Sequence, residues 1–346
     1  MDNVDWLAQP LCRRKFLART AAIVGGAYLV SCDPVSIPST TNPIAKHAVI
    51  ALVQGVENDP FYITMQKGAQ AKAGELGATL VVAAPAQFDA ALQIPLVEDM
   101  IKKKVDVLLI AACDKHALVE PLRRAYNAGI KVISVDTYIG DGNYTDGEVT
   151  FPLSYIGSDN VEGGKIAGIA LIKALGGKGK VYIQNVKPGI STILQREQGC
   201  KSAIEATNGA VVLVGVDYNN DSVATARKQT AAVLRRVSDL AGIFGANLFS
   251  AEGAAQAVKD ADKLGVIKIA SFDAPEQAIV DLRNGVVDLV IAQQPAAMGS
   301  IAVDYAIKAL SGAGNSIQKR VTTGYVIIDR YNVDTPEAQS AIYKSR

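Results

Sequence analysis

Short apolar runs recur along the chain, and stretches with the apolar spacing of a helix separate them. The runs are apolar almost throughout, which is typical of strands buried on both faces of a parallel sheet. Strand and helix in alternation build a doubly wound α/β domain with right-handed crossovers. The predicted strands are 47–53, 79–84, 105–111, 131–135, 180–184, 210–216, 240–245, 266–272, 287–292 and 326–330, and the clearest helices are 61–76, 90–103, 161–175, 224–237, 251–264 and 296–310.

An irregular segment interrupts this alternation. Residues 138–152 contain Gly140, Gly142 and Gly147 and show no clear period, so they divide two similar sets of strand-helix units. We therefore predict two similar α/β domains with parallel sheets, joined by a multi-strand hinge with a ligand cleft between them. A single (β/α)8 barrel would require eight uninterrupted units, which this segment argues against. The predicted domains are 44–157 with 294–322, and 158–293 with 323–346.

The first residues have the layout of an export signal. Arg13, Arg14 and Lys15 precede a short apolar stretch, 20–32, that is too short to span a membrane comfortably. The arginine pair followed by Lys-Phe-Leu resembles a twin-arginine signal, although Sec export stays open. Leu-Val-Ser-Cys at 29–32 resembles a bacterial lipobox, which implies cleavage after residue 31 and a lipid on Cys32. An uncleaved anchor with an incidental cysteine is the alternative.

Residues 32–43 are rich in Pro, Ser and Thr and are predicted to form a flexible linker behind Cys32. The body that follows suits a large core, because 49% of the 346 residues are hydrophobic and 20% are charged. The 35 basic and 34 acidic residues leave no basic excess for a nucleic acid partner. Two histidines and four cysteines supply little for a metal cluster, so we predict neither a metal nor another cofactor.

Polar and aromatic side chains follow the predicted strands. Ligands of open α/β sheets bind beyond the carboxyl ends of strands, so these positions are candidates for a site. Carboxylates and carboxamides suit neighbouring hydroxyl groups, and an aromatic face suits the C–H side of a sugar ring. The residues at these strand ends include no strong pair of nucleophile and base, so no catalytic residue is predicted. The alternative is that each polar residue only caps the next helix. The residues are Asp59, Phe61, Tyr62, Asp136, Thr137, Asn247, Asp273, Gln293 and Gln294.

Several of these segments together resemble the type I periplasmic sugar-binding proteins of the ribose-binding group. The resemblance extends over residues 44–343 and lies in the order and spacing of the segments. It implies two α/β domains joined by three crossing strands, with the ligand in a cleft that a hinge closes. The segments are Asp-Pro-Phe-Tyr at 59–62, Ile-Ser-Val-Asp at 133–136, Gly-Ser-Asp-Asn at 157–160, Phe-Gly-Ala-Asn at 244–247, Ser-Phe-Asp at 271–273, Ile-Ala-Gln-Gln-Pro at 291–295 and Asn-Val-Asp-Thr-Pro-Glu at 332–337.

The resemblance also implies roles for individual residues. Phe61 and Tyr62 match the positions that stack on the sugar, and Asn58 or Asp59 matches the polar position beside these rings. The positions that bind hydroxyl groups are matched by Asp136, Asn247, Asp273 and Gln293. Further candidates from their place in these motifs are Thr137, Arg196 and Asn220.

Two departures bear on the ligand. The ribose binders of this group carry cleft arginines where the chain has Thr137 and Leu194, with Arg196 two residues further on. Losing two bidentate donors removes a fork that holds adjacent hydroxyl groups. Ribose itself is therefore not predicted, and another pentose, a hexose, a polyol or a furanosyl signal stays open. A ring position of the family near residues 218–220 also has no fixed counterpart.

The predicted function is that of an extracytoplasmic solute-binding lipoprotein, which we expect to be a monomer in the periplasm or on the outer face of the cytoplasmic membrane. It binds a monosaccharide or polyol and delivers it to an ABC permease, without acting as an enzyme. One alternative is a sensor that presents the sugar to a chemotaxis or kinase receptor. Another is a glycosidase that uses Asp136 and Asp273 as acid and base. A DNA-binding regulator is disfavoured by the export signal and the charge balance.

Overall fold

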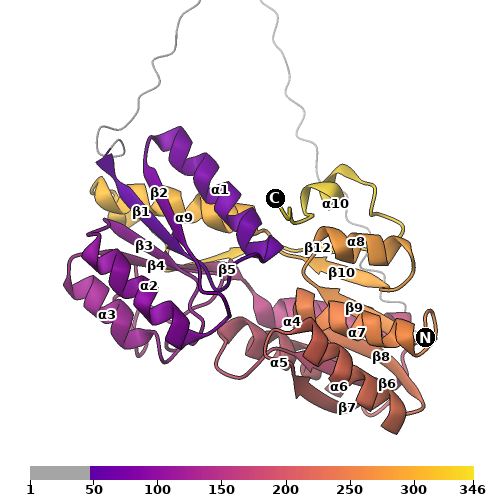
Figure 1. Cartoon of the computed structure of the whole chain (residues 1–346). Helices are drawn as coiled ribbons and strands as arrows, with labels where there is room; N and C mark the ends of the chain where they lie inside the picture. The colour runs from indigo at the N-terminus through magenta and orange to yellow at the C-terminus, as the bar shows by residue number, and fades with distance from the viewer. Residues whose placement is uncertain (1–46) are drawn as a thin grey trace, which may run out of the picture. The chain divides into compact units, whose positions relative to one another are not determined.

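The structure, a computed structural model, describes residues 47–346 and contains two six-stranded sheets (Figure 1). The first sheet has the order β11-β5-β4-β3-β1-β2, and every pair in it is parallel. Its strands are β1 (Val49–Val53), β2 (Thr79–Ala83), β3 (Val107–Ile110), β4 (Lys131–Val135), β5 (Tyr155–Ser158) and β11 (Arg320–Thr323). Four helices pack on this sheet or on one another and form the first lobe together with it. They are α1 (Pro60–Leu76), α2 (Ala90–Lys102), α3 (Val119–Asn127) and α9 (Pro295–Leu310).

The second sheet has the order β12-β10-β9-β8-β6-β7. Its strands are β6 (Gly179–Asn185), β7 (Val211–Tyr218), β8 (Leu240–Gly245), β9 (Lys268–Phe272), β10 (Leu289–Ala292) and β12 (Val326–Ile328). The second lobe also contains α4 (Asn160–Ala174), α5 (Ser191–Glu205), α6 (Val223–Arg236), α7 (Leu248–Asp260), α8 (Glu276–Arg283) and α10 (Pro336–Ser340).

The two parallel-sheet α/β domains predicted from the hydrophobic pattern are confirmed, and two open sheets exclude a barrel. One detail of the parallel-sheet prediction is wrong, because β12 pairs with β10 in the antiparallel direction. β12 enters directly from β11 of the other lobe, so its direction follows from the route of the chain between the lobes. The irregular segment 138–152 contains neither helix nor strand.

The chain passes between the lobes three times. The passages lie between β5 and α4, between β10 and α9, and between β11 and β12. The predicted domain boundaries at 157/158, 293/294 and 322/323 stay a prediction. The predicted leader, Cys32 and the whole predicted linker lie outside the described residues. Within residues 47–346 no helix is both long and apolar enough to cross a membrane.

Close packing of α1 and α9 brings distant parts of the sequence together in the first lobe (Figure 1). A β-carbon at Gly68 would overlap the backbone of Ala296, and one at Gly299 would overlap the carbonyl of Met65. Glycine is therefore required on both helices at their contact. This contact fixes the start of each helix, and both starts contribute residues to the cleft described below.

We predict that Gly68→Ala lowers the free energy of unfolding by about 2 kcal/mol, because the added methyl group forces two backbones apart. Gly74→Ala is the matched control on the same helix, since a β-carbon there meets nothing within 4 Å. The control should raise stability by about 0.5–1 kcal/mol through the better helix propensity of alanine. Urea unfolding of both variants measures the difference, and equal stabilities would contradict this account of the contact.

Candidate functional site

Residues from the carboxyl ends of strands in both sheets line one cavity between the lobes. It is a small cavity that opens to solvent. Polar and aromatic residues line it together with a small apolar wall. They are Asp59, Phe61, Tyr62, Phe88, Asp136, Val186, Ile190, Thr192, Ile193, Arg196, Asp221, Asn247, Leu248, Asp273 and Gln293.

The start of α1 supplies the first group. Asp59 caps the helix by accepting a hydrogen bond from the backbone N–H of Phe61 at 2.7 Å through Oδ1. Phe61 and Tyr62 then lie in the first turn, with their rings edge to face and centroids 5.2 Å apart. Asp59 therefore holds the helix start while its second oxygen stays available to a ligand.

Asp136 follows β4 in the left-handed backbone region, with φ 60°. Its Oδ2 accepts a hydrogen bond from the hydroxyl of Tyr62 at 2.8 Å. Its backbone carbonyl accepts one from Tyr155 at 2.8 Å. These contacts aim the carboxylate into the cavity and tie it to the aromatic pair.

Arg196 of α5 is the cation of the cavity and is 3% exposed. Its Nε donates to Asn160 Oδ1 at 2.8 Å, and Nη1 donates to the carbonyl of Ala246 at 2.9 Å. The guanidinium carbon lies 4.0 Å from the centroid of the Phe272 ring, and Nη1 lies 3.6 Å from Asp273 Oδ2. Arg196 is therefore held by the protein on several sides, and its Nη2 has no partner among the described residues.

Asp273 and Gln293 form a pair at the ends of neighbouring strands. Asp273 follows β9 with φ 73°, and its Oδ1 accepts from Gln293 Nε2 at 2.7 Å and from the Tyr343 hydroxyl at 3.2 Å. The backbone N–H of Gln293 donates to the same hydroxyl at 2.7 Å. Gln293 is 1% exposed, and its Oε1 has no hydrogen-bond partner within the described part of the chain. A buried acceptor without a protein partner is available to a ligand or a water molecule.

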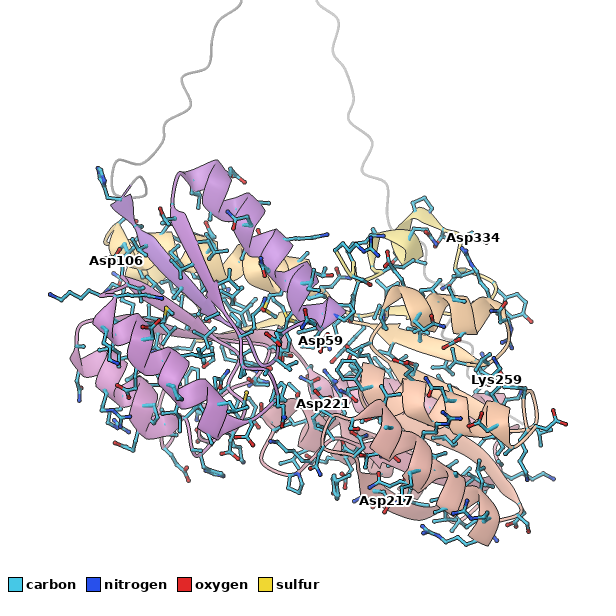
Figure 2. The ribbon with its side chains drawn as sticks, viewed as in Figure 1. Asp59, Asp106, Asp217, Asp221, Lys259 and Asp334 are labelled. Carbon is cyan, nitrogen blue, oxygen red and sulfur yellow. The ribbon has the colours of Figure 1, made fainter. Side chains whose placement is uncertain are left out.

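Asn247 and Asp221 also line the cavity from the second lobe. Asn247 caps α7 through Oδ1, which accepts from the backbone of Ser250 at 3.0 Å. Its Nδ2 donates to Asp221 Oδ1 at 2.7 Å. Asp221 follows β7 with φ 61° and is half-buried. Asp59 and Asp221 come from opposite lobes and flank the gap between them (Figure 2).

Four carboxyl groups therefore share the cavity with a single arginine. Burial raises the pKa of Asp59 well above its usual range, and the neighbouring charge of Asp221 adds to this. Burial also raises the pKa of Asp136 to about 6, against the lowering effects of Arg196 and Tyr62. The pKa of Asp221 is raised to about 6 by burial as well. Burial thus favours the protonated form of Asp59, Asp136 and Asp221 more than water would.

Eight of the predicted binding residues line this cavity together: Asp59, Phe61, Tyr62, Asp136, Arg196, Asn247, Asp273 and Gln293. Asn58 and Asn220 are exposed and line a separate outer groove at the mouth of the cleft. Thr137 is fully buried and turns away, because its hydroxyl donates to the carbonyl of Ala112 at 2.9 Å. Asp59 and Asn247 cap helices, as the helix-cap alternative expects, and they also line the cavity. Asp136 and Asp273 line the cavity without capping a helix.

The cavity contains an arginine, although Thr137 and Leu194 do not line it. Leu194 lies in a shallow groove on the outer face of α5 with Glu197 and Lys201, whereas Arg196 points into the cleft. Two residues are more than half a turn of helix, so a shift of two moves a side chain to another face. Arg196 therefore supplies an arginine to the cavity, and Leu194 does not line it.

Sequence reasoning missed Asp221, Phe88 and Tyr343. Asp221 directly follows the predicted Asn220, and both have left-handed backbones, so only the fold decides which side chain enters the cavity. Phe88 follows β2 and is 6.4 Å from Tyr62 between ring centroids. Tyr343 comes from the C-terminal tail and is fully buried beside Asp273. Polar positions at strand ends could have indicated Asp221, but no local signal indicates Tyr343.

The comparisons agree with this geometry. The profile of the periplasmic binding protein domain family matches residues 50–314. The chain is 33% identical over 264 residues to the ribose import binding protein of Haemophilus influenzae, covering 76% of this chain and 86% of that one. An ABC transporter solute-binding protein from Agrobacterium vitis, solved with bound α-D-tagatopyranose, is 44% identical with a TM-score of 0.84, covering 86% of this chain and 99% of that one. A second Agrobacterium vitis solute-binding protein, with bound D-fucose, is 31% identical with a TM-score of 0.80, covering 86% and 100%.

Fold and site together define a type I periplasmic sugar-binding protein. The chain belongs to the periplasmic binding protein domain family, among the sugar-binding solute-binding proteins of ABC transporters. Membership implies export to the periplasm. These relatives are transport proteins that bind sugars, which fits a role without catalysis.

The raised pKa values predict how the stability of the unliganded protein depends on pH. Asp136 and Asp221 titrate near pH 6 in the folded protein, against a usual value of 3.8. The folded state therefore binds more protons than the unfolded state between these values, so lowering the pH from 7 to 5 should raise the free energy of unfolding. The gain should be about 1 kcal/mol per group.

Urea unfolding at pH 7 and pH 5 without ligand measures this gain. Because other groups titrate as well, the test is the difference between the wild type and Asp136→Asn or Asp221→Asn. Asparagine keeps the left-handed backbone at both positions and cannot titrate. Each variant should gain less than the wild type on acidification, and an undiminished gain in both would refute the assignment.

Proposed function

We propose that this protein binds a monosaccharide or related polyol in the cavity, closes around it by a hinge motion and delivers it to the permease of an ABC importer. The observation that carries the proposal is the composition of the cavity, where carboxylates, carboxamides and Arg196 meet the aromatic pair of α1. Each oxygen left without a protein partner is an acceptor for a hydroxyl donor, and the rings suit the apolar face of a sugar.

Ligands of the relatives support a monosaccharide. The Agrobacterium vitis protein at 44% identity was solved with α-D-tagatopyranose, and the one at 31% identity with D-fucose. A curated relative at 33% identity is a ribose import binding protein. Tagatose is therefore the first sugar to test on this protein, with other hexoses and pentoses beside it.

Contacts across the cleft support the hinge. Lys187 Nζ in the second lobe donates to the carbonyl of Phe88 in the first at 2.6 Å. The backbone N–H of Lys115 donates to Gly189 at 3.1 Å, and that of Tyr138 donates to the Ser191 hydroxyl at 3.1 Å. These few polar contacts lie apart from the three connecting passages. An opening about those passages would break them, and a ligand that bridges both lobes would favour the closed state.

The test of the proposal is a thermal-shift and calorimetry panel of free hexoses, pentoses and polyols on the purified protein from residue 33 onward. At least one sugar should stabilise the folded protein, because a ligand of the native state alone raises its unfolding midpoint. A complete panel without a stabilising sugar or polyol would overturn the proposal.

We predict that Asp273→Asn weakens binding of the best sugar at least 100-fold while the protein stays folded. The substitution removes a buried charge that accepts from the ligand, and asparagine tolerates the backbone at φ 73°. The matched control is Asp262→Asn, the same change at an exposed residue with φ 54° outside the cleft. Calorimetry of both should separate them, and an unchanged affinity of Asp273→Asn would remove Asp273 from the site.

The proposal includes anchoring of the exported protein through Cys32 by a lipid, as the segment Leu-Val-Ser-Cys suggests. We predict that Cys32→Ser moves the protein from the membrane fraction to the soluble exported fraction, since several acyl chains are needed for a stable anchor. Fractionation of cells expressing both forms, with metabolic labelling by a fatty acid, measures this. A wild type that incorporates no fatty acid would contradict the lipid anchor and leave the binding proposal untouched.

A further inference from the structure

Asp221 differs from the other carboxyl groups of the cavity in its position. Asp59, Asp136 and Asp273 are buried, with exposed fractions of 6%, 6% and 3%. Asp221 is half-buried and lines both the inner cavity and the outer groove, where Asn58, Asn220 and Lys187 lie. It is therefore the acceptor that marks the outer end of the cavity.

Most hydrogen-bond donors of the cavity are already used by the protein. Asn247 Nδ2 is bonded to Asp221, Gln293 Nε2 to Asp273, and the Tyr62 hydroxyl to Asp136. Acceptors are left over, because one oxygen of Asp136, one of Asp221 and the Oε1 of Gln293 have no partner within residues 47–346. The cavity thus selects a ligand with many hydroxyl donors, placed both deep in the cleft and at its outer end.

We propose that Asp221 accepts a hydrogen bond from the exocyclic hydroxymethyl group of a hexose, and that this contact makes the protein prefer a hexose to the pentose that lacks only that group. This inference rests on the proposed sugar-binding function. The deep acceptors Asp136, Asp273 and Gln293 serve hydroxyl groups attached directly to the ring. A hydroxymethyl group extends furthest from the ring, so its oxygen reaches the outer end.

The other side of the cleft supports the same assignment. Asp59 lies across the gap from Asp221 in the other lobe (Figure 2), and the charge of Asp221 is the strongest of the charges that raise its pKa. Because burial raises that pKa well above the usual range, the Asp59 carboxyl group holds a proton more readily than an exposed one. A hydroxyl group between the two can donate to Asp221 and accept from Asp59. The hydroxymethyl group of a hexose would pair with Asp221 in this site. A pentose without that group would leave the Asp221 carboxylate without this partner.

The test compares ligand pairs that differ by the hydroxymethyl group alone. Suitable pyranose pairs are D-tagatose with D-lyxose, D-allose with D-ribose, and D-galactose with L-arabinose. For the pair whose hexose binds best, the wild type should bind the hexose at least tenfold more tightly than the pentose. That preference corresponds to about 1.4 kcal/mol, close to the contribution of one hydrogen bond to a charged group.

The variant is Asp221→Gly, because glycine keeps the left-handed backbone at φ 61° while the carboxylate is removed. It should lose at least tenfold in affinity for the hexose and change less than threefold for the pentose. Asn220→Gly is the matched control, since it makes the same change in the same loop, at φ 52°, outside the inner cavity. The control should keep the preference of the wild type.

Three results would overturn the inference while the proposed function stands. They are a wild type that binds the pentose as tightly as the hexose, an Asp221→Gly variant that weakens both sugars equally, and one that changes neither. If the wild type binds no sugar or polyol at all, the proposed function itself fails and the inference fails with it.

Discussion

The cleft depends on burying several carboxylates around one arginine. Removing a charge from water costs several kcal/mol unless partners replace the water. Arg196 provides part of this compensation, and the protein holds it firmly with Asn160, the carbonyl of Ala246 and the ring of Phe272. The helix that carries it is pressed against its neighbour, because a β-carbon at Gly164 would overlap the carbonyl of Arg196. One oxygen each of Asp136 and Asp221 has no protein partner among the described residues and is left to accept from a ligand.

One carboxylate in each lobe is positioned by the same backbone conformation at the end of a strand. Asp136 and Asp273 each follow a central strand, and both adopt the left-handed region. Their backbone N–H groups donate to Ile156 and Ile291 of the next strand, at 2.8 and 2.9 Å. Asp and Asn tolerate this conformation better than other residues with a β-carbon. The carboxylates are therefore held by the sheets themselves rather than by flexible loops.

The C-terminal tail connects the site to both lobes. Tyr343 lies against the Phe61 ring, with centroids 5.7 Å apart, and its hydroxyl contacts Asp273 and the backbone of Gln293. One residue later, the N–H of Lys344 donates to Thr64 Oγ1 of α1 at 2.8 Å. The tail thus supports the rear of the cavity while it contacts the first lobe, close to where the chain passes between them.

The sequence by itself determined the α/β class, the division into two similar domains and most of the long elements, because buried parallel strands leave continuous apolar runs. It also indicated seven residues of the cavity, since ligands of such sheets lie at the carboxyl ends of strands, and the family resemblance added Arg196. It missed β5 and β11, whose sequences Tyr-Ile-Gly-Ser and Arg-Val-Thr-Thr form no continuous apolar run. It also named no helix at α3, α5, α8 or α10. The antiparallel direction of β12 was missed as well, since it depends on the route of the chain between the lobes.

Only the tertiary structure decided which neighbouring side chain enters the cleft. Leu194 and Arg196 differ by the rotation of a helix, and Asn220 and Asp221 differ by the path of one loop. Tyr343 reaches Asp273 across 70 residues of sequence. A hydrophobic pattern carries information about which face of an element is buried, but the side chains of a cleft are selected by contacts between elements that are distant in sequence.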